Sequence, residues 1–262
     1  MQRFLRRLGR ASRGGLAFVG RLARLQWSLA RVVLTPSRHN LRLIAKLTLT
    51  QARFSGVQAA PLVAALGLII GAVSILQFVA ILSGIADELI GKVLVTIIVR
   101  EMGPLITAVL VIGRSGTAIT TELGTMRLEG ELEALRAYRI DPVAFVILPR
   151  VLGMVLAMFG LLVLFDVTGL IGGSMLAVAV KNLSAILLRS RMAAALTDAD
   201  FILSGLKAVL FGQTIAMLSC YFGLQVMRSP TELPQAVTKA VVASLTGVFF
   251  CDALLVAGHY FL

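Results

Sequence analysis

Long apolar runs separated by short polar turns occupy the chain from residue 57 onward. A helix needs about 20 apolar residues to cross the ~30 Å hydrocarbon layer of a bilayer. Runs of that length or more predict five transmembrane helices, over residues 57–86, 93–121, 142–180, 201–227 and 240–262. Residues 56–262 are therefore expected to form one transmembrane domain.

The first 55 residues follow a different pattern. Between Leu16 and Arg53, leucines and valines recur on one side of a helix and arginines on another. This segregation is typical of a helix that lies in the membrane interface. Thr35-Pro36 interrupts it, because the residue before a proline disfavours the helical conformation. The predicted fold is all-α: a basic amphipathic interfacial segment (1–55) followed by five spans.

Composition and charge sharpen this picture. The 262 residues are 58% hydrophobic and 15% charged, whereas soluble domains carry about 25% charged residues. Residues 1–53 hold 12 Lys/Arg and no acid, and they account for the whole net charge of +12. Each basic residue near an anionic leaflet contributes about 1 kcal/mol, so the N-terminus is expected on the cytoplasmic side. A transit peptide stays an alternative, and nucleic-acid binding is disfavoured in a segment joined to a membrane domain.

Motifs for catalysis and metal binding are missing from the sequence. It contains no GxxxxGK[ST], HExxH or GxSxG pattern, and His39 and His259 lie near opposite ends. Cys220 and Cys251 fall inside apolar runs and lack metal-ligand spacing. We therefore expect no enzyme activity, metal or cofactor in this chain.

Ionisable residues inside spans are costly and usually face a cavity or a partner. Arg100 and Glu101 are neighbours that point about 100° apart on a helix. Either Glu101 lines a polar pocket while Arg100 reaches the interface or a lipid phosphate, or both are hydrated at the end of the second span. Asp166, Lys207 and Asp252 are single charges in three other spans, and Lys207 could form a salt bridge with an acid that the sequence leaves undetermined.

Close helix contacts and a loop helix are also indicated. Gly67 and Gly71 form a GxxxG pattern, which is either a packing face or a chance product of a glycine-rich helix. Residues 122–138 predict a short charged helix, on which Leu128, Leu132 and Leu135 share one face. This helix is either a solvated connector or an element that docks in a partner protein.

Five motifs in a fixed order resemble the MlaE-type permease family, the membrane subunits of ABC transporters that work with MCE-domain proteins. They are Arg100-Glu101-Met102-Gly103-Pro104, Gly113-Arg114-Ser115-Gly116-Thr117-Ala118, Glu122-Leu123-Gly124-Thr125-Met126-Arg127, Asp141-Pro142 and Pro149-Arg150. The resemblance extends over residues 56–262.

The resemblance implies a homodimer in the bacterial inner membrane, or in a plastid inner envelope, with phospholipid or a similar hydrophobic molecule as cargo. It implies an outer MCE-domain protein and two cytoplasmic ATPase subunits that hold the ATP and Mg²⁺ and bind a coupling helix at 122–138. The coupling residues would be Glu122, Gly124, Met126, Arg127, Leu128, Glu129, Leu132 and Arg136.

In that family the lipid cavity lies at the dimer interface, beside the first span and the start of the second. The resemblance thus implies a lipid pocket formed by Gln77, Phe78, Ile81, Leu82, Arg100 and Glu101. One alternative is an ion- or proton-coupled carrier that uses Glu101, Asp166 and Asp252. Another is a scaffold that anchors partners through residues 1–53.

Overall fold

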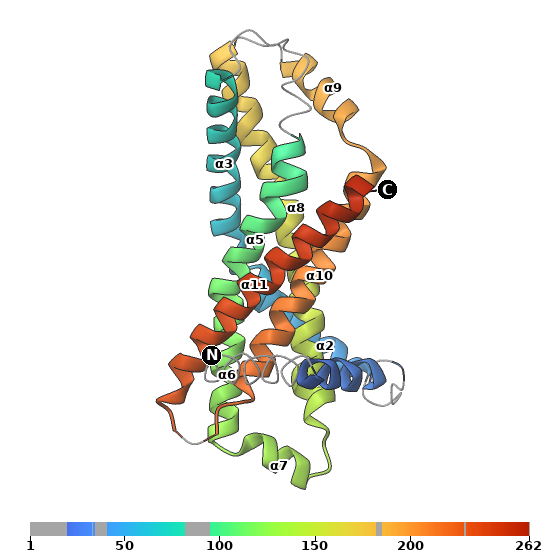
Figure 1. The fold of residues 1–262 in the computed structure, drawn as a ribbon, viewed down its shortest axis with the longest axis vertical. Coiled ribbons are helices and arrows are strands. Elements are labelled where there is room, and N and C mark those ends of the chain that lie inside the picture. Colours follow the sequence, from blue (N-terminus) through green and yellow to red (C-terminus); the bar gives the residue numbers. More distant parts are fainter. Residues whose placement is uncertain are drawn as a thin grey trace, which may run out of the picture.

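The computed structural model describes residues 20–32, 34, 41–81, 95–181, 185–227 and 229–261. These residues are almost entirely helical and include no strand, so the predicted all-α fold is confirmed. Figure 1 shows long helices that run side by side, with the short helix α7 (Glu131–Ala137) at one end of the bundle and α9 (Ala185–Ala195) at the other. We call these the α7 end and the α9 end.

Five helical runs within the described residues are long and apolar enough to cross a membrane, as the hydropathy pattern predicted. The first is α3 (Ala60–Ile81), the fourth is α10 (Asp198–Gly223) and the fifth is α11 (Glu232–Phe261). The second run joins η1 (Thr96–Met102), α5 (Gly103–Val111), η2 (Ile112–Gly116) and α6 (Thr117–Leu128), and the third joins η3 (Val143–Ile147) to α8 (Leu148–Lys181).

Several boundaries differ from the hydropathy prediction because charged first turns were assigned to loops. The fourth span starts at Asp198 rather than residue 201, because Thr197 and Asp200 form a capping box at its N-terminus. The backbone N–H of Thr197 donates to Asp200 Oδ2 at 2.9 Å. The fifth helix starts at Glu232, eight residues before the predicted position.

Two helices precede the first span. One covers residues 20–32 and lies across the α7 end of the long helices (Figure 1, dark blue). Its Leu29 is buried, and Leu25 and Val32 pack beside it, whereas Arg24 is exposed. The second, α2 (Leu41–Gly56), packs against α8. The predicted break at Thr35-Pro36 lies outside the described residues, and the interfacial location of both helices stays a prediction.

Glycines bring α3 and α8 into direct backbone contact. A Cβ atom at Gly71 would overlap the carbonyl of Gly169, and one at Gly172 would overlap the carbonyl of Leu68. Gly67 faces the same helix, where its Cβ would overlap Thr168. The GxxxG pattern of the first span therefore marks a helix contact rather than a chance repeat. Close approach of this kind gains dispersion energy where apolar lipid offers no hydrophobic driving force.

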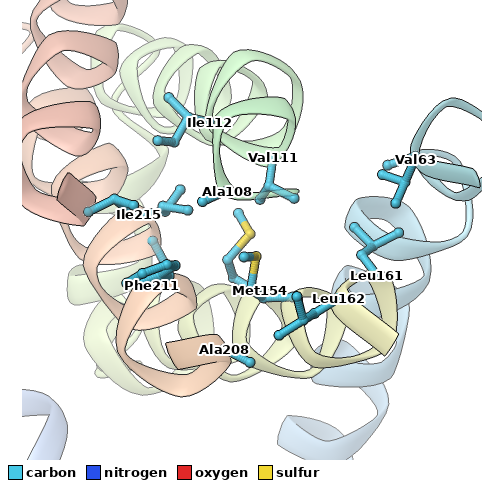
Figure 2. Packing of buried hydrophobic residues seen from close by; sticks show 14 of the residues in the cluster. Val63, Ala108, Val111, Ile112, Met154, Leu161, Leu162, Ala208, Phe211 and Ile215 are labelled. Carbon is cyan, nitrogen blue, oxygen red and sulfur yellow. The ribbon is translucent and has the colours of Figure 1, made fainter. Parts of the chain in front are cut away.

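The apolar core lies where the second, third and fourth spans meet. In Figure 2, Met154 of α8 lies between Ala108 and Val111 of α5 on one side and Phe211 of α10 on another. Met154 and Phe211 are fully buried. Val63 of α3 points toward Leu161 of α8 in the same view. This packing fixes the spans against each other and so positions the polar groups at both ends.

Candidate functional sites at the two ends of the second span

The second span contains two short π-helical segments, and a third precedes α8. The segments are η1, η2 and η3, at Thr96–Met102, Ile112–Gly116 and Val143–Ile147. Each overlaps or adjoins one of the motifs singled out in the sequence. A π-helix is rare and is often found at functional sites, since it shifts the following side chains round the helix axis. The polar residues of these segments are therefore candidates for functional sites.

Arg100 of η1 forms a two-point ion pair with Asp200 at the start of α10. Its Nε lies 2.6 Å from Oδ1, and its NH2 donates to Oδ2 at 3.1 Å. The Asp200 side chain is 2% exposed, and the same carboxylate caps α10. The sequence suggested that Arg100 reaches water or a lipid phosphate; the structure instead gives it a carboxylate partner that hydropathy had placed in a loop.

Lys207 of α10 is the most deeply buried charge in the described chain, with 1% of its side chain exposed. Its Nζ lies 2.8 Å from Asp252 Oδ1 on α11 and donates to the Arg100 carbonyl at 2.6 Å. Pro104, four residues beyond Arg100, has no N–H with which to satisfy that carbonyl. Lys207 therefore binds the acid that the sequence left undetermined and holds η1, α10 and α11 together.

Of the other residues predicted to line a lipid pocket, the structure describes the side chains of Glu101 and Gln77. Glu101 is half-buried and forms no hydrogen bond or ion pair with the described residues, and Gln77 is exposed on α3. Phe78 and Ile81 belong to α3, but their side chains lie outside the description, as does all of Leu82. The lipid pocket therefore stays a prediction.

Asp166 of α8 has a buried Oδ1 atom without a hydrogen-bond partner among the described residues. It lies against Gly103, where a Cβ atom would overlap this oxygen. Of the three acids considered for a carrier, Asp252 is thus paired with Lys207, while Glu101 and Asp166 have no such partner among the described residues.

Arg114 and Ser115 of η2 hold the elbow between α2 and α3. Arg114 donates to the carbonyl of Phe54 at 3.2 Å and to Gln58 Oε1 at 2.5 Å, and Ser115 Oγ donates to the carbonyl of Ser55 at 3.5 Å. Carbonyls at a helix C-terminus lack intrahelical donors, which explains the polar Gly-Arg-Ser-Gly motif. The sequence analysis singled out Arg114 and Ser115 only as part of a motif and did not predict this role.

The single helix predicted over 122–138 is divided in the structure. Helix α6 continues from the second span to Leu128, and α7 starts at Glu131 after Gly130, which has a φ of +76°. Leu128 and Leu132 therefore do not lie on one continuous helical face. Leu132 is buried at 2% exposure, while Glu129 and Arg136 are exposed. The Arg127–Glu133 ion pair, at 2.5 Å, spans the turn.

The turn between α6 and α7 forms a second elbow, the α6–α7 elbow, and the end of α6 at its base contacts the neighbouring spans. Glu122 forms an ion pair with Arg150 of α8 at 2.7 Å, and Arg150 also donates to the Val146 carbonyl at 2.8 Å and approaches Met126 Sδ at 3.7 Å. A Cβ atom at Gly124 would overlap the Leu233 side chain of α11. Residues 122–137, the α6–α7 elbow, thus consist of the end of α6, which is fixed to α8 and α11, and the short charged helix α7.

Together, the fold and these polar sites define a multi-pass α-helical membrane protein with a charged elbow at one end and a buried charge network toward the other. A profile of the family "Permease MlaE" matches residues 48–257. The chain belongs to the MlaE permease family.

Curated relatives support this membership. The chain is 32% identical over 213 residues to the "Intermembrane phospholipid transport system permease protein MlaE" of Haemophilus influenzae, covering 80% of this chain and 82% of that protein. It is 30% identical over 214 residues to a "Probable ABC transporter permease protein" of Rickettsia conorii, covering 81% and 83%. It is also 33% identical over 166 residues to "Protein TRIGALACTOSYLDIACYLGLYCEROL 1, chloroplastic" of Arabidopsis thaliana, covering 63% of this chain and about half (47%) of the relative.

Proposed function

We propose that this chain is the membrane subunit of an ABC transporter that moves phospholipid, working as a homodimer in the bacterial inner membrane. Family membership and the phospholipid named for the Haemophilus relative support the cargo class. ATP hydrolysis would take place in two separate ATPase subunits, and an MCE-domain protein would bind at the α9 end. The α7 end and the N-terminus would face the cytoplasm.

The observation that supports this proposal best is the geometry of the α6–α7 elbow. Its exposed face offers Glu129 and Arg136 to a partner, while its base is fixed by the Glu122–Arg150 ion pair and by Gly124. A push on α7 would therefore move the second, third and fifth spans rather than bend a loop. Transmission of this kind needs a rigid element with two arrangements.

At the other end of the second span, the proposed lipid pocket would form between two copies of the chain. Glu101 is available as a polar group for a lipid headgroup, because it has no partner among the described residues. Gln77, Phe78, Ile81 and Leu82 would contribute from the first span. Arg100 would act as a positioning residue, since its pairing with Asp200 holds η1 in place.

Charge reversal at the elbow tests the proposal. The permease is co-expressed with its ATPase subunit, and lipid-stimulated ATP hydrolysis is measured in liposomes for Glu129→Lys/Arg136→Glu. We expect loss of stimulation with unchanged permease folding, while the control Asp198→Lys, an exposed acid at the α9 end, retains it. Normal stimulation in the elbow variant contradicts the proposal. Transport by the purified chain alone, driven by a pH or sodium gradient, would favour the carrier alternative instead.

A further inference from the structure

Three basic side chains form a stripe along one face of α2. Arg42, Lys46 and Arg53 lie at i, i+4 and i+11, which a helix of 3.6 residues per turn places within about 40° of each other. With Leu49 between them, they line a surface hollow of about 460 Å³. All three are exposed and none forms an ion pair with the described residues. The stripe is therefore a cationic surface without an internal counter-ion.

A second, apolar hollow of about 430 Å³ adjoins this stripe. It lies between the end of α2, the start of α3 and the face of α8, and it shares Leu49 and Arg53 with the first hollow. Its walls include Val57, Leu156 and Gly160. Hollows of 300–1,000 Å³ are the usual size of small-molecule sites. The two hollows together form one continuous path, which leads from the basic stripe on α2 into the apolar hollow; we call this apolar hollow the groove.

We propose that this path is a binding site for one anionic phospholipid. The phosphate would lie on Arg42, Lys46 and Arg53, and an acyl chain would follow the groove along α8. Charge complementarity selects an anionic headgroup, and the adjoining apolar groove selects a lipid over a free phosphate, which would leave the groove empty. A second copy of this chain that met the stripe with its own α2 is a poorer match, because residues 1–86 hold no acid.

This site is separate from the proposed transport pathway and does not depend on it. The groove lies beside the α2–α3 elbow that Arg114 holds, whereas Glu101 and the Arg100–Asp200 pair lie toward the α9 end. A lipid bound here would fasten α2 to α8 at the membrane surface. Its binding can be measured on the purified chain without any partner protein.

Two variants test binding of the headgroup and binding of the acyl chain separately. Arg42→Gln/Lys46→Gln neutralises exposed cations, and its matched control is Arg139→Gln/Lys239→Gln, an exposed cation in the turn after α7 and another on α11. Gly160→Leu fills the groove, since a Cβ atom there meets nothing within 4 Å. Its control is Gly258→Leu on α11, where a Cβ atom also meets nothing within 4 Å.

Native mass spectrometry of the full chain in detergent would count bound phosphatidylglycerol or phosphatidylcholine of identical acyl chains. We expect tighter binding of phosphatidylglycerol, weakened about fivefold for each cation neutralised in the α2 variant. Gly160→Leu should lose one lipid of either kind, and both controls should match the wild type.

Equal binding of the two lipids by the wild type would overturn the proposal. So would an α2 variant that matches its control, or displacement of the lipid by equimolar inorganic phosphate. A Gly160→Leu variant that keeps the lipid but changes the fraction of chains found as dimers would also overturn it, because the groove would then be a contact between two copies. Should Gly160→Leu fail to fold, the exposed α2 variant decides by itself.

Discussion

Lys207 on α10 and Asp252 on α11 form an ion pair of 2.8 Å inside the apolar bundle. The two residues are 45 positions apart in the sequence, and each lies alone in an otherwise apolar run. Lys207 also donates to the Arg100 carbonyl, and Arg100 pairs with Asp200. A chain of charges thus links the second, fourth and fifth spans toward the α9 end, so that η1 cannot shift without disturbing both later spans.

Removing one member of this buried pair should destabilise the protein strongly. Asp252→Asn leaves the Lys207 ammonium without its counter-charge, and breaking a buried pair costs about 3–5 kcal/mol. The double variant Lys207→Met/Asp252→Leu should recover much of that loss, because it removes both charges. Thermal unfolding midpoints in detergent should therefore be lower for Asp252→Asn than for the double variant. A single variant as stable as the wild type would show that the pair is dispensable.

The contact between α3 and α8 should not tolerate a side chain at Gly71. Gly71→Ala places a methyl group against the Gly169 carbonyl, and overpacking of this kind costs about 1–3 kcal/mol. Gly20→Ala is a suitable control, since a Cβ atom there meets nothing within 4 Å. Unfolding midpoints of the two variants should differ by several degrees. Equal midpoints would mean that the helices separate at no cost.

The turn between α6 and α7 depends on the positive φ of Gly130. Gly130→Ala meets no steric neighbour, but it must adopt φ near +76°, which costs an L-residue about 1–2 kcal/mol. We expect the elbow to straighten or fray, with faster amide exchange over residues 129–137 and reduced ATPase stimulation. Gly258→Ala, at ordinary backbone angles, should change neither. Unaltered exchange in Gly130→Ala would mean that the turn is held by the Arg127–Glu133 pair instead.

Trp27 provides a direct measurement of the interfacial prediction. It is the only tryptophan of the chain and is 62% exposed on the helix of residues 20–32, with the Arg31 guanidinium 5.7 Å from its ring. Amphipathic indole rings favour the headgroup level of a bilayer. Lipids brominated near the ester groups should therefore quench its fluorescence more than lipids brominated at the chain ends. Strong quenching by an aqueous quencher and none by bromolipid would place this helix in solution.

The sequence by itself determined which segments cross the membrane. Hydropathy adds up residue by residue, so the five spans emerge from local composition without knowledge of neighbours. The ordered polar motifs likewise indicated the family that the profile match shows. The same local reasoning placed the start of the fourth span too late. It assigned Asp200 to a loop, whereas Asp200 caps this helix and pairs with Arg100.

Only the tertiary structure decided which polar groups meet. Lys207 could have paired with any acid in the spans, and the choice of Asp252 depends on how the faces of α10 and α11 are turned toward each other. The leucine spacing across residues 128–135 suggested one continuous helix, yet the chain turns at Gly130, which has a positive φ, and Arg127 and Glu133 pair across the turn while Leu132 is buried. Partner choice and helix direction are set by packing between segments distant in sequence, and a one-dimensional pattern does not contain that information.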